Sequence, residues 1–203
     1  SPHLVRYHER IRIDGREVGD AELLGAFAAV EAARTRGEPV PLTYFEFGTL
    51  AALWLFARAA PDALVLEVGL GGRLDAVNVV DADVAVVTSI GLDHMDFLGP
   101  TREDIGREKA GVARPGRPLV CGEPDPPASL VRHARAVGAP LLAIGRDYGY
   151  LDEGRQWQYR GPGGARFGLP PPALRGEVQL ANAATALTAL DTRRMAVCTA
   201  RST

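Results

Sequence analysis

The chain has 203 residues, a formal net charge of −2, 46% hydrophobic residues and 24% charged residues. This length suits one medium domain or two small ones, and the composition is that of an ordinary globular protein with a sizeable core. The small net charge gives no reason to expect nucleic acid or an anionic membrane as a partner. With only two cysteines, no membrane-length apolar run and no signal peptide, the expected location is the cytoplasm.

The first part of the chain predicts a short strand with a turn, followed by two helices. Residues 8–18 alternate between apolar and polar side chains and contain an Asp-Gly turn signal. Residues 20–36 show helical spacing, with Asp20 as the expected N-cap. Residues 43–60 predict a second helix, capped near Thr43 and ended by a proline.

Four short apolar runs in the middle of the chain predict buried strands. The runs occupy residues 63–66, 84–87, 118–121 and 141–144. Helical stretches lie at roughly 101–113 and 127–138. Short apolar strands that alternate with helices are typical of an α/β fold, in which a mostly parallel sheet is covered by helices on both faces.

The last part of the chain changes character. Residues 147–175 are rich in aromatic residues, glycine and proline, and predict a small antiparallel hairpin and a linker. Residues 177–190 predict an Ala/Leu helix. Residues 191–203 have no clear pattern and are expected to form a frayed tail.

Two side chains that bind metals follow the predicted strands. Glu67 comes directly after the first run, and Asp93-His94 follows the second. Ligands bind beyond the carboxyl ends of the strands in an open parallel sheet, so these side chains are expected at one edge. Each has an ordinary alternative, since Glu67 could cap the next loop and His94 could cap a helix. Together they favour a binding site.

Lys109 is the only lysine in a chain that otherwise uses arginine for its cations. Lysine can shift its pKa and react as an amine, whereas arginine cannot. A cation beside metal ligands would repel the metal, but an amine that has reacted with carbon dioxide is an anionic carbamate with oxygens that suit Mg²⁺. Forming it requires a depressed lysine pKa. An exposed helix lysine that has no chemical role is the alternative.

The segment Gly69-Leu70-Gly71-Gly72 allows positive φ and close backbone approach. It is a weak signal alone, and it is not a phosphate-binding P-loop. The printed sequence contains no Gly-x-x-x-x-Gly-Lys-Ser/Thr motif.

Several motifs, in order from Ser1 to about Leu190, closely resemble folylpolyglutamate synthase/dihydrofolate synthase of the Mur-ligase superfamily. The motifs are Ser1-Pro2-His3-Leu4, Leu42 to Glu46, Leu66 to Ala76, Thr88 to His94, and Gly106 to Gly111. The resemblance implies that residues 1–190 form an incomplete central ATPase domain, without the family's preceding P-loop segment and following C-terminal domain, and that 191–203 form a tail.

The resemblance also implies an activity. The family uses ATP to join L-glutamate to dihydropteroate or a (tetrahydro)folate through an acyl phosphate, with Mg²⁺ assisting phosphoryl transfer. The expected partners are these small molecules, and a monomer is expected. A truncated, inactive remnant that binds only pterin or metal is the alternative. A Mur-type ligase acting on cell-wall precursors ranks lower, because the motifs around Thr43 and Gly69 look folate-type.

Site residues follow from the same resemblance, position by position. Ser1, Glu67 and His94 match the metal ligands, and Lys109 matches the carbamylated lysine; Glu67, His94 and Lys109 are also the expected catalytic residues. The matches to the pterin-substrate contacts are Thr43, Tyr44, Phe45, Glu46, Leu74, Asp75 and Ala76. Asn182 matches an ATP-contacting asparagine, although Val178 stands where the family often has histidine.

Overall fold

The computed structural model describes residues 2–174, 176 and 178–200. The chain divides into two compact units, which are described one at a time. The first consists of Ser1–Leu70 with Asp75–Val79, and the second of Gly71–Leu74 with Val80–Thr203. The assignment of residues 1–190 to one family domain therefore stays a proposal.

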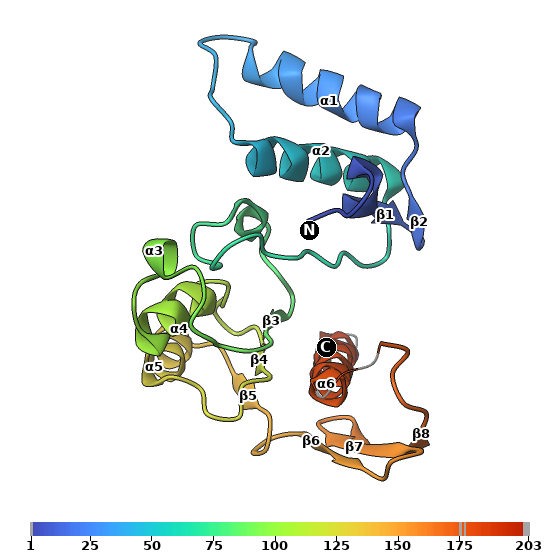
Figure 1. Ribbon diagram of the computed structural model, residues 1–203, viewed down its shortest axis with the longest axis vertical. Coiled ribbons are helices and arrows are strands. Elements are labelled where there is room, and N and C mark those ends of the chain that lie inside the picture. The colour runs from blue at the N-terminus through green and yellow to red at the C-terminus, as the bar shows by residue number, and fades with distance from the viewer. Residues whose placement is uncertain (1, 175, 177, 201–203) are drawn as a thin grey trace. The chain divides into compact units, whose positions relative to one another are not determined.

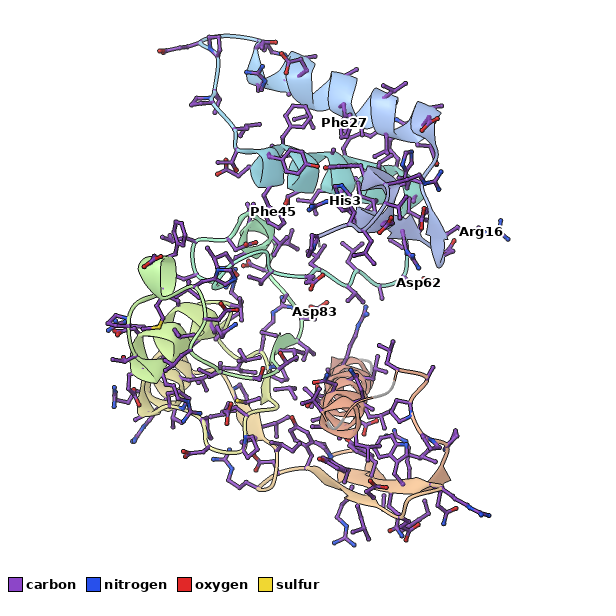
Figure 2. The ribbon with its side chains drawn as sticks, in the orientation of Figure 1. His3, Arg16, Phe27, Phe45, Asp62 and Asp83 are labelled. Atoms are coloured by element: carbon purple, nitrogen blue, oxygen red, sulfur yellow. The ribbon has the colours of Figure 1, made fainter. Side chains whose placement is uncertain are left out.

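The first unit is mainly helical (Figure 1). Its elements are the 3₁₀ helix η1 (Tyr7–Arg10), strands β1 (Arg12–Ile13) and β2 (Arg16–Glu17), helices α1 (Asp20–Arg34) and α2 (Tyr44–Ala59), and the 3₁₀ helix η2 (Ala76–Val79). Helices α1 and α2 pack together around a core that contains Leu23, Ala26 and Leu55. Phe27 of α1 is partly buried against that core (Figure 2).

The predicted starts of these helices were right at α2 and wrong by one residue at α1. Thr43 is the N-cap of α2, and its side chain accepts a hydrogen bond from the Glu46 N–H. At α1 the cap is Gly19 rather than Asp20, because the Glu22 carboxylate reaches back to the Gly19 N–H at 2.7 Å and leaves Asp20 in the first turn. The predicted Asp-Gly turn is confirmed and joins the antiparallel strands β1 and β2.

The strand predicted at residues 63–66 does not form a ladder in the described chain. The segment carries no helix or strand assignment, and the side chain of Val65 is almost fully exposed. An apolar run predicts burial, but a strand also needs a hydrogen-bonded neighbour. No described strand pairs with this run, so the prediction of a strand at these residues is wrong.

The second unit contains a parallel sheet and an antiparallel sheet (Figure 1). Its elements are β3 (Ala85–Val87), α3 (Met95–Leu98), α4 (Arg102–Ala110), β4 (Leu119–Cys121), α5 (Ala128–Val137), β5 (Leu141–Ala143), β6 (Gly149–Asp152), β7 (Trp157–Gly161), β8 (Gly164–Leu169) and α6 (Gln179–Ala200). Strands β3, β4 and β5 are parallel in that order, as expected for three of the four apolar runs.

The parallel sheet is covered on both faces, as predicted. Leu119 and Cys121 of β4 face a core shared with α4 and α5, whereas the intervening Val120 packs with Ala184 of α6. All three residues of β4 are fully buried. The alternation follows from the two-residue period of a strand, and it places β4 at the centre of the unit.

The aromatic region forms a three-stranded antiparallel sheet in the order β6, β7, β8, which is larger than the predicted hairpin. Tyr148 and Tyr159 tie this region to α6, where their hydroxyls bond Thr185 and Thr188. Burial raises the pKa of Tyr148 to about 12. Helix α6 continues past the expected boundary at residue 190, and Asp191 is buried in it. No helix of the described residues is long and apolar enough to cross a membrane.

Candidate functional site

In the first unit the structure brings together residues from two of the sequence motifs. The ring of Phe45 lies directly against Gly69, where an added Cβ would stand 2.7 Å from the ring carbon Cζ. The Asp75 carboxylate accepts hydrogen bonds from the N–H groups of Gly69 and Leu70, each at 2.9 Å. A side chain at position 69 would displace the ring, so glycine is required here for close approach.

The same Asp75 side chain organises the segment that follows it. Its second oxygen accepts from the Val77 N–H at 3.0 Å, at the start of η2. One carboxylate therefore fixes the backbone on both sides of the predicted pterin contacts Asp75 and Ala76. This arrangement resembles an Asx turn, in which a short carboxylate satisfies backbone N–H groups that no ladder occupies.

Thr43 and Glu46 form a reciprocal helix cap. The Glu46 carboxylate accepts from the Thr43 N–H at 2.7 Å and from the Thr43 hydroxyl at 2.8 Å. These bonds, chiefly the one from the Thr43 N–H, lower the pKa of Glu46. Both residues are thus engaged in holding the start of α2, and this places Phe45 in its first turn.

A cavity of about 560 Å³ lies within the first unit, and it is lined by Tyr44, Phe45 and Glu67 among other residues. Two predicted pterin contacts and one predicted metal ligand therefore share one cavity. Arg10 also lines it and lies over the rings of Tyr7 and Tyr44, at 5.7 and 5.5 Å from their centroids. The sequence does not single out Arg10, because one arginine among so many carries no signal.

His94 lies in the second unit, seven residues after β3 ends at Val87. Its backbone is left-handed, with φ 51° and ψ 39°, and its side chain is more than half exposed. Its N–H bonds the Asp93 carboxylate at 2.8 Å. A left-handed conformation costs a non-glycine residue roughly 1–2 kcal/mol, and such strain is concentrated at functional positions.

Lys109 lies in the last turn of α4, where a cation interacts favourably with the helix dipole. The loop Gly71–Leu74 packs on this end of the helix. The Arg73 N–H donates to the Glu108 carbonyl at 2.9 Å, and the Arg73 guanidinium contacts the Glu108 carboxylate at 3.1 Å. Residues 71–74 are thereby fixed to the turn that carries Lys109.

Two glycines allow that close packing. A Cβ at Gly72 would stand 3.0 Å from the Glu108 carbonyl oxygen and 3.1 Å from that of Lys109. A Cβ at Gly111 would meet the Cα of Arg73 at 2.6 Å. In the described structure, these glycines allow the backbone of the loop at residues 71–74 to contact the end of α4.

The other predicted residues are not brought into one described group. Ser1 lies outside the described residues. Glu67 belongs to the first unit, whereas His94 and Lys109 belong to the second. Leu74 is largely exposed, and Asn182 is exposed in the first turn of α6.

Among the residues that the structure describes, no three His, Cys, Asp or Glu side chains form a group that could hold a metal. The predicted metal ligands do not require such a group of three. Only the carboxylate and the imidazole among them are of these residue types, and the others are a hydroxyl and a modified lysine. Glu67 and His94 are both exposed, and of the two only the Glu67 carboxylate offers the oxygen donors that suit a hard cation.

Comparison with known proteins defines the class first. Residues 22–120 match the Mur ligase middle domain. Together with the parallel sheet covered on both faces, this match makes the chain a member of the Mur ligase class.

Relatives within that class are similar over nearly the whole chain. Dihydrofolate synthase/folylpolyglutamate synthase of Escherichia coli is 52% identical over 190 residues, which is 94% of this chain and 43% of the relative. The structure of E. coli FolC in complex with DHPP and ADP superposes with a TM-score of 0.89 at 50% identity, covering 95% of this chain and 45% of that one. A bifunctional folylpolyglutamate synthase/dihydrofolate synthase with Mn, AMPPNP and L-glutamate bound gives 0.86 at 52% identity, with the same coverage.

The chain belongs to the dihydrofolate synthase/folylpolyglutamate synthase family, an enzyme family of ligases. It spans less than half the length of the curated relatives it matches.

Proposed function

We propose that this chain is the part of an ATP-dependent ligase that carries its pterin and metal residues, and that the whole protein joins L-glutamate to dihydropteroate or a folate. The observation that carries the proposal is the grouping of Phe45, Gly69 and Asp75 in the first unit. Its support is the similarity to a FolC structure that holds DHPP and ADP. Parallel assays with dihydropteroate and with a folate decide which of the two is preferred.

The pterin subsite is formed by the first turn of α2 and the loop around Asp75. Phe45 offers an aromatic face to a flat heterocycle, and Asp75 holds the loop backbone so that the subsite is preorganised. Thr43, Tyr44, Glu46, Leu74 and Ala76 complete the proposed contacts. The Thr43–Glu46 cap fixes the helix start, so its contribution to binding is positional.

In the proposed reaction, a carboxylate oxygen of the pterin substrate attacks the γ-phosphorus of ATP. The bond from phosphorus to the bridging oxygen breaks and ADP leaves. The glutamate amine then attacks the acyl carbon, phosphate leaves, and the amine loses a proton to give the amide. Asn182, exposed in the first turn of α6, is the proposed contact to the nucleotide.

Ser1, Glu67, His94 and the carbamate of Lys109 are the proposed metal ligands. When bound, Mg²⁺ would neutralise charge that builds up on the phosphate oxygens. Lys109 contributes an anion only after its neutral amine has attacked carbon dioxide and lost a proton. Its place on a helix end fixed by Arg73 and Glu108 restricts where that group points.

The proposal is tested by incubating the whole protein that contains this chain with Mg²⁺-ATP and labelled glutamate, with dihydropteroate or tetrahydrofolate, and following both ADP and labelled product. Lys109→Arg is the matched control, because it keeps the cation but cannot be carbamylated. Product from the whole protein, lost in its Lys109→Arg variant, is the expected result. Folded protein that gives neither ADP nor product would favour a remnant that binds pterin or metal without turnover.

Carbamylation has a direct readout in this chain. Lys109 is the only lysine, so ¹³C-labelled carbon dioxide should give a side-chain carbamate signal that is absent from Lys109→Arg. An identical spectrum for the two proteins would rule out the carbamate.

A further inference from the structure

The segment between β3 and His94 is held at one residue by side chains from two other elements. The Ile90 N–H donates to the Glu123 carboxylate at 3.0 Å, and the Ile90 carbonyl accepts from the Arg102 guanidinium Nε at 3.2 Å. Ile90 is buried at 3% exposure. A buried backbone amide and carbonyl require partners, and here an ionic side chain supplies each one.

The two side chains are also joined to each other. Arg102 contacts Glu123 at 3.3 Å, and it donates to the Asp125 carbonyl at 3.0 Å. The Glu123 carboxylate also accepts from the Asp125 N–H at 3.4 Å. The pair thus links the segment after β3, the segment after β4 and the first turn of α4 within the second unit.

The geometry favours a role for Arg102 in orienting the backbone over a role in stabilising the fold. The Arg102 side chain is 42% exposed, so its charge is screened, and ion pairs of this kind contribute little to stability. Its planar guanidinium, however, donates to the Ile90 and Asp125 carbonyls and at the same time forms an ion pair with Glu123. A lysine has no such fork and could not reproduce these directions.

His94 lies four residues beyond Ile90 and has a left-handed backbone. A strained residue persists only when its surroundings fix it on both sides. On one side, Arg102 and Glu123 hold Ile90. On the other, α3 begins directly after His94 and packs against α4.

We propose that Arg102 and Glu123 are positioning residues for His94, acting through the Ile90 backbone. Neither side chain is assigned a role in the chemistry. The proposal rests on the proposed function only where it takes His94 to be a metal ligand. The proposed restraint on the His94 backbone does not depend on a bound metal.

The test uses the whole ¹⁵N-labelled chain without metal, and compares it with Arg102→Lys and Glu123→Gln. Both variants keep side-chain size, and Glu123→Gln can still accept from Ile90 while losing its attraction to Arg102. Arg132→Ala is the matched control, because Arg132 makes an exposed pair with Glu103 in the same unit. The measurements are the hydrogen-exchange rate of the Ile90 amide and the backbone scalar coupling of His94, which reports its φ.

Both variants are expected to exchange the Ile90 amide roughly 10-fold faster or more, the size expected from weakening a charge-assisted hydrogen bond. The His94 coupling should move towards a conformational average, with the melting temperature near that of wild type and the control unchanged. Folded variants whose exchange rate and coupling equal those of wild type would overturn the proposal.

A second measurement separates this inference from the proposed function. Mn²⁺ should broaden the His94 imidazole signals of the wild-type chain, and less so in Arg102→Lys. Wild-type protein without that broadening would count against His94 as a ligand, while the metal-free measurements would still decide the positioning role.

Discussion

Two apolar runs with the same sequence character have different structural outcomes in this protein. The run at residues 118–121 contains β4 (Leu119–Cys121), which is paired on both edges and fully buried. Residues 63–66 form no ladder in the described chain, and Val65 is 95% exposed. The difference teaches that an apolar run specifies a preference for burial, whereas the strand itself is made by its neighbours.

The backbone that lies outside ladders is organised by carboxylates. Asp75 accepts from Gly69, Leu70 and Val77, and Glu9 accepts from three successive N–H groups at residues 4–6. A carboxylate can therefore fix irregular backbone at positions that a ladder does not reach. These are also the regions that carry the family's motifs.

The largest expected effect tests the two apolar runs directly. Leu119→Ala removes a fully buried side chain from the middle of the sheet and should lower the free energy of unfolding by about 2–5 kcal/mol. Val65→Ala, the matched change in the unpaired run, should alter it by less than about 0.5 kcal/mol. Denaturant unfolding measures both. Equal losses in the two variants would mean that residues 63–66 are buried as deeply as β4.

The next effect concerns the loop that follows the unpaired run. Gly111→Ala should cost about 1–3 kcal/mol, because the new methyl group meets the Cα of Arg73 at 2.6 Å and forces the loop away from α4. Gly149→Ala is the control, since nothing lies within 4 Å of its added Cβ. Comparable stability of the two variants in thermal unfolding would contradict the close packing.

A smaller effect is expected for the ion pair at the same place. Arg73→Ala should lower stability by less than about 1 kcal/mol, since the Arg73 side chain is half exposed and the charges are screened. The backbone bond from Arg73 to Glu108 remains in the variant. A loss that exceeds that of Gly111→Ala would show that the side chains, rather than the backbone contact, hold the loop.

The smallest effect is local and depends on pH. Hydrogen bonds from the N–H groups of Leu4, Arg6 and Val5 lower the pKa of Glu9 from 4.5 to about 2. The folded state thus favours the ionised form, so the stabilisation is present above pH 4.5 and is lost as the pH falls towards 2. The amide shifts of residues 4–6 should stay constant as the pH passes through 4.5, with Glu9→Gln as the reference spectrum. A titration centred near 4.5 would contradict the capping role.

Much of the fold could be predicted from local sequence patterns, whereas contacts between distant segments could not. The caps and apolar periods predicted α2, β4 and α5 closely, because the relevant signals lie within a few residues of each element. The position of Phe45 against Gly69 and the hydrogen bond from Ile90 to Glu123 each join residues that are more than twenty positions apart. Only the resemblance to a family, rather than any period or spacing, pointed to Phe45 and Asp75 together.

The pterin subsite in the first unit is the claim most open to direct measurement. Binding of dihydropteroate to the purified chain can be followed by calorimetry and compared with Phe45→Ala and with the control Phe27→Ala, whose ring lies between α1 and α2 (Figure 2). The account predicts saturable binding that Phe45→Ala weakens by at least about 10-fold, while Phe27→Ala retains it wherever the variant stays folded. Equal affinity in wild type and folded Phe45→Ala would contradict the assignment of this subsite.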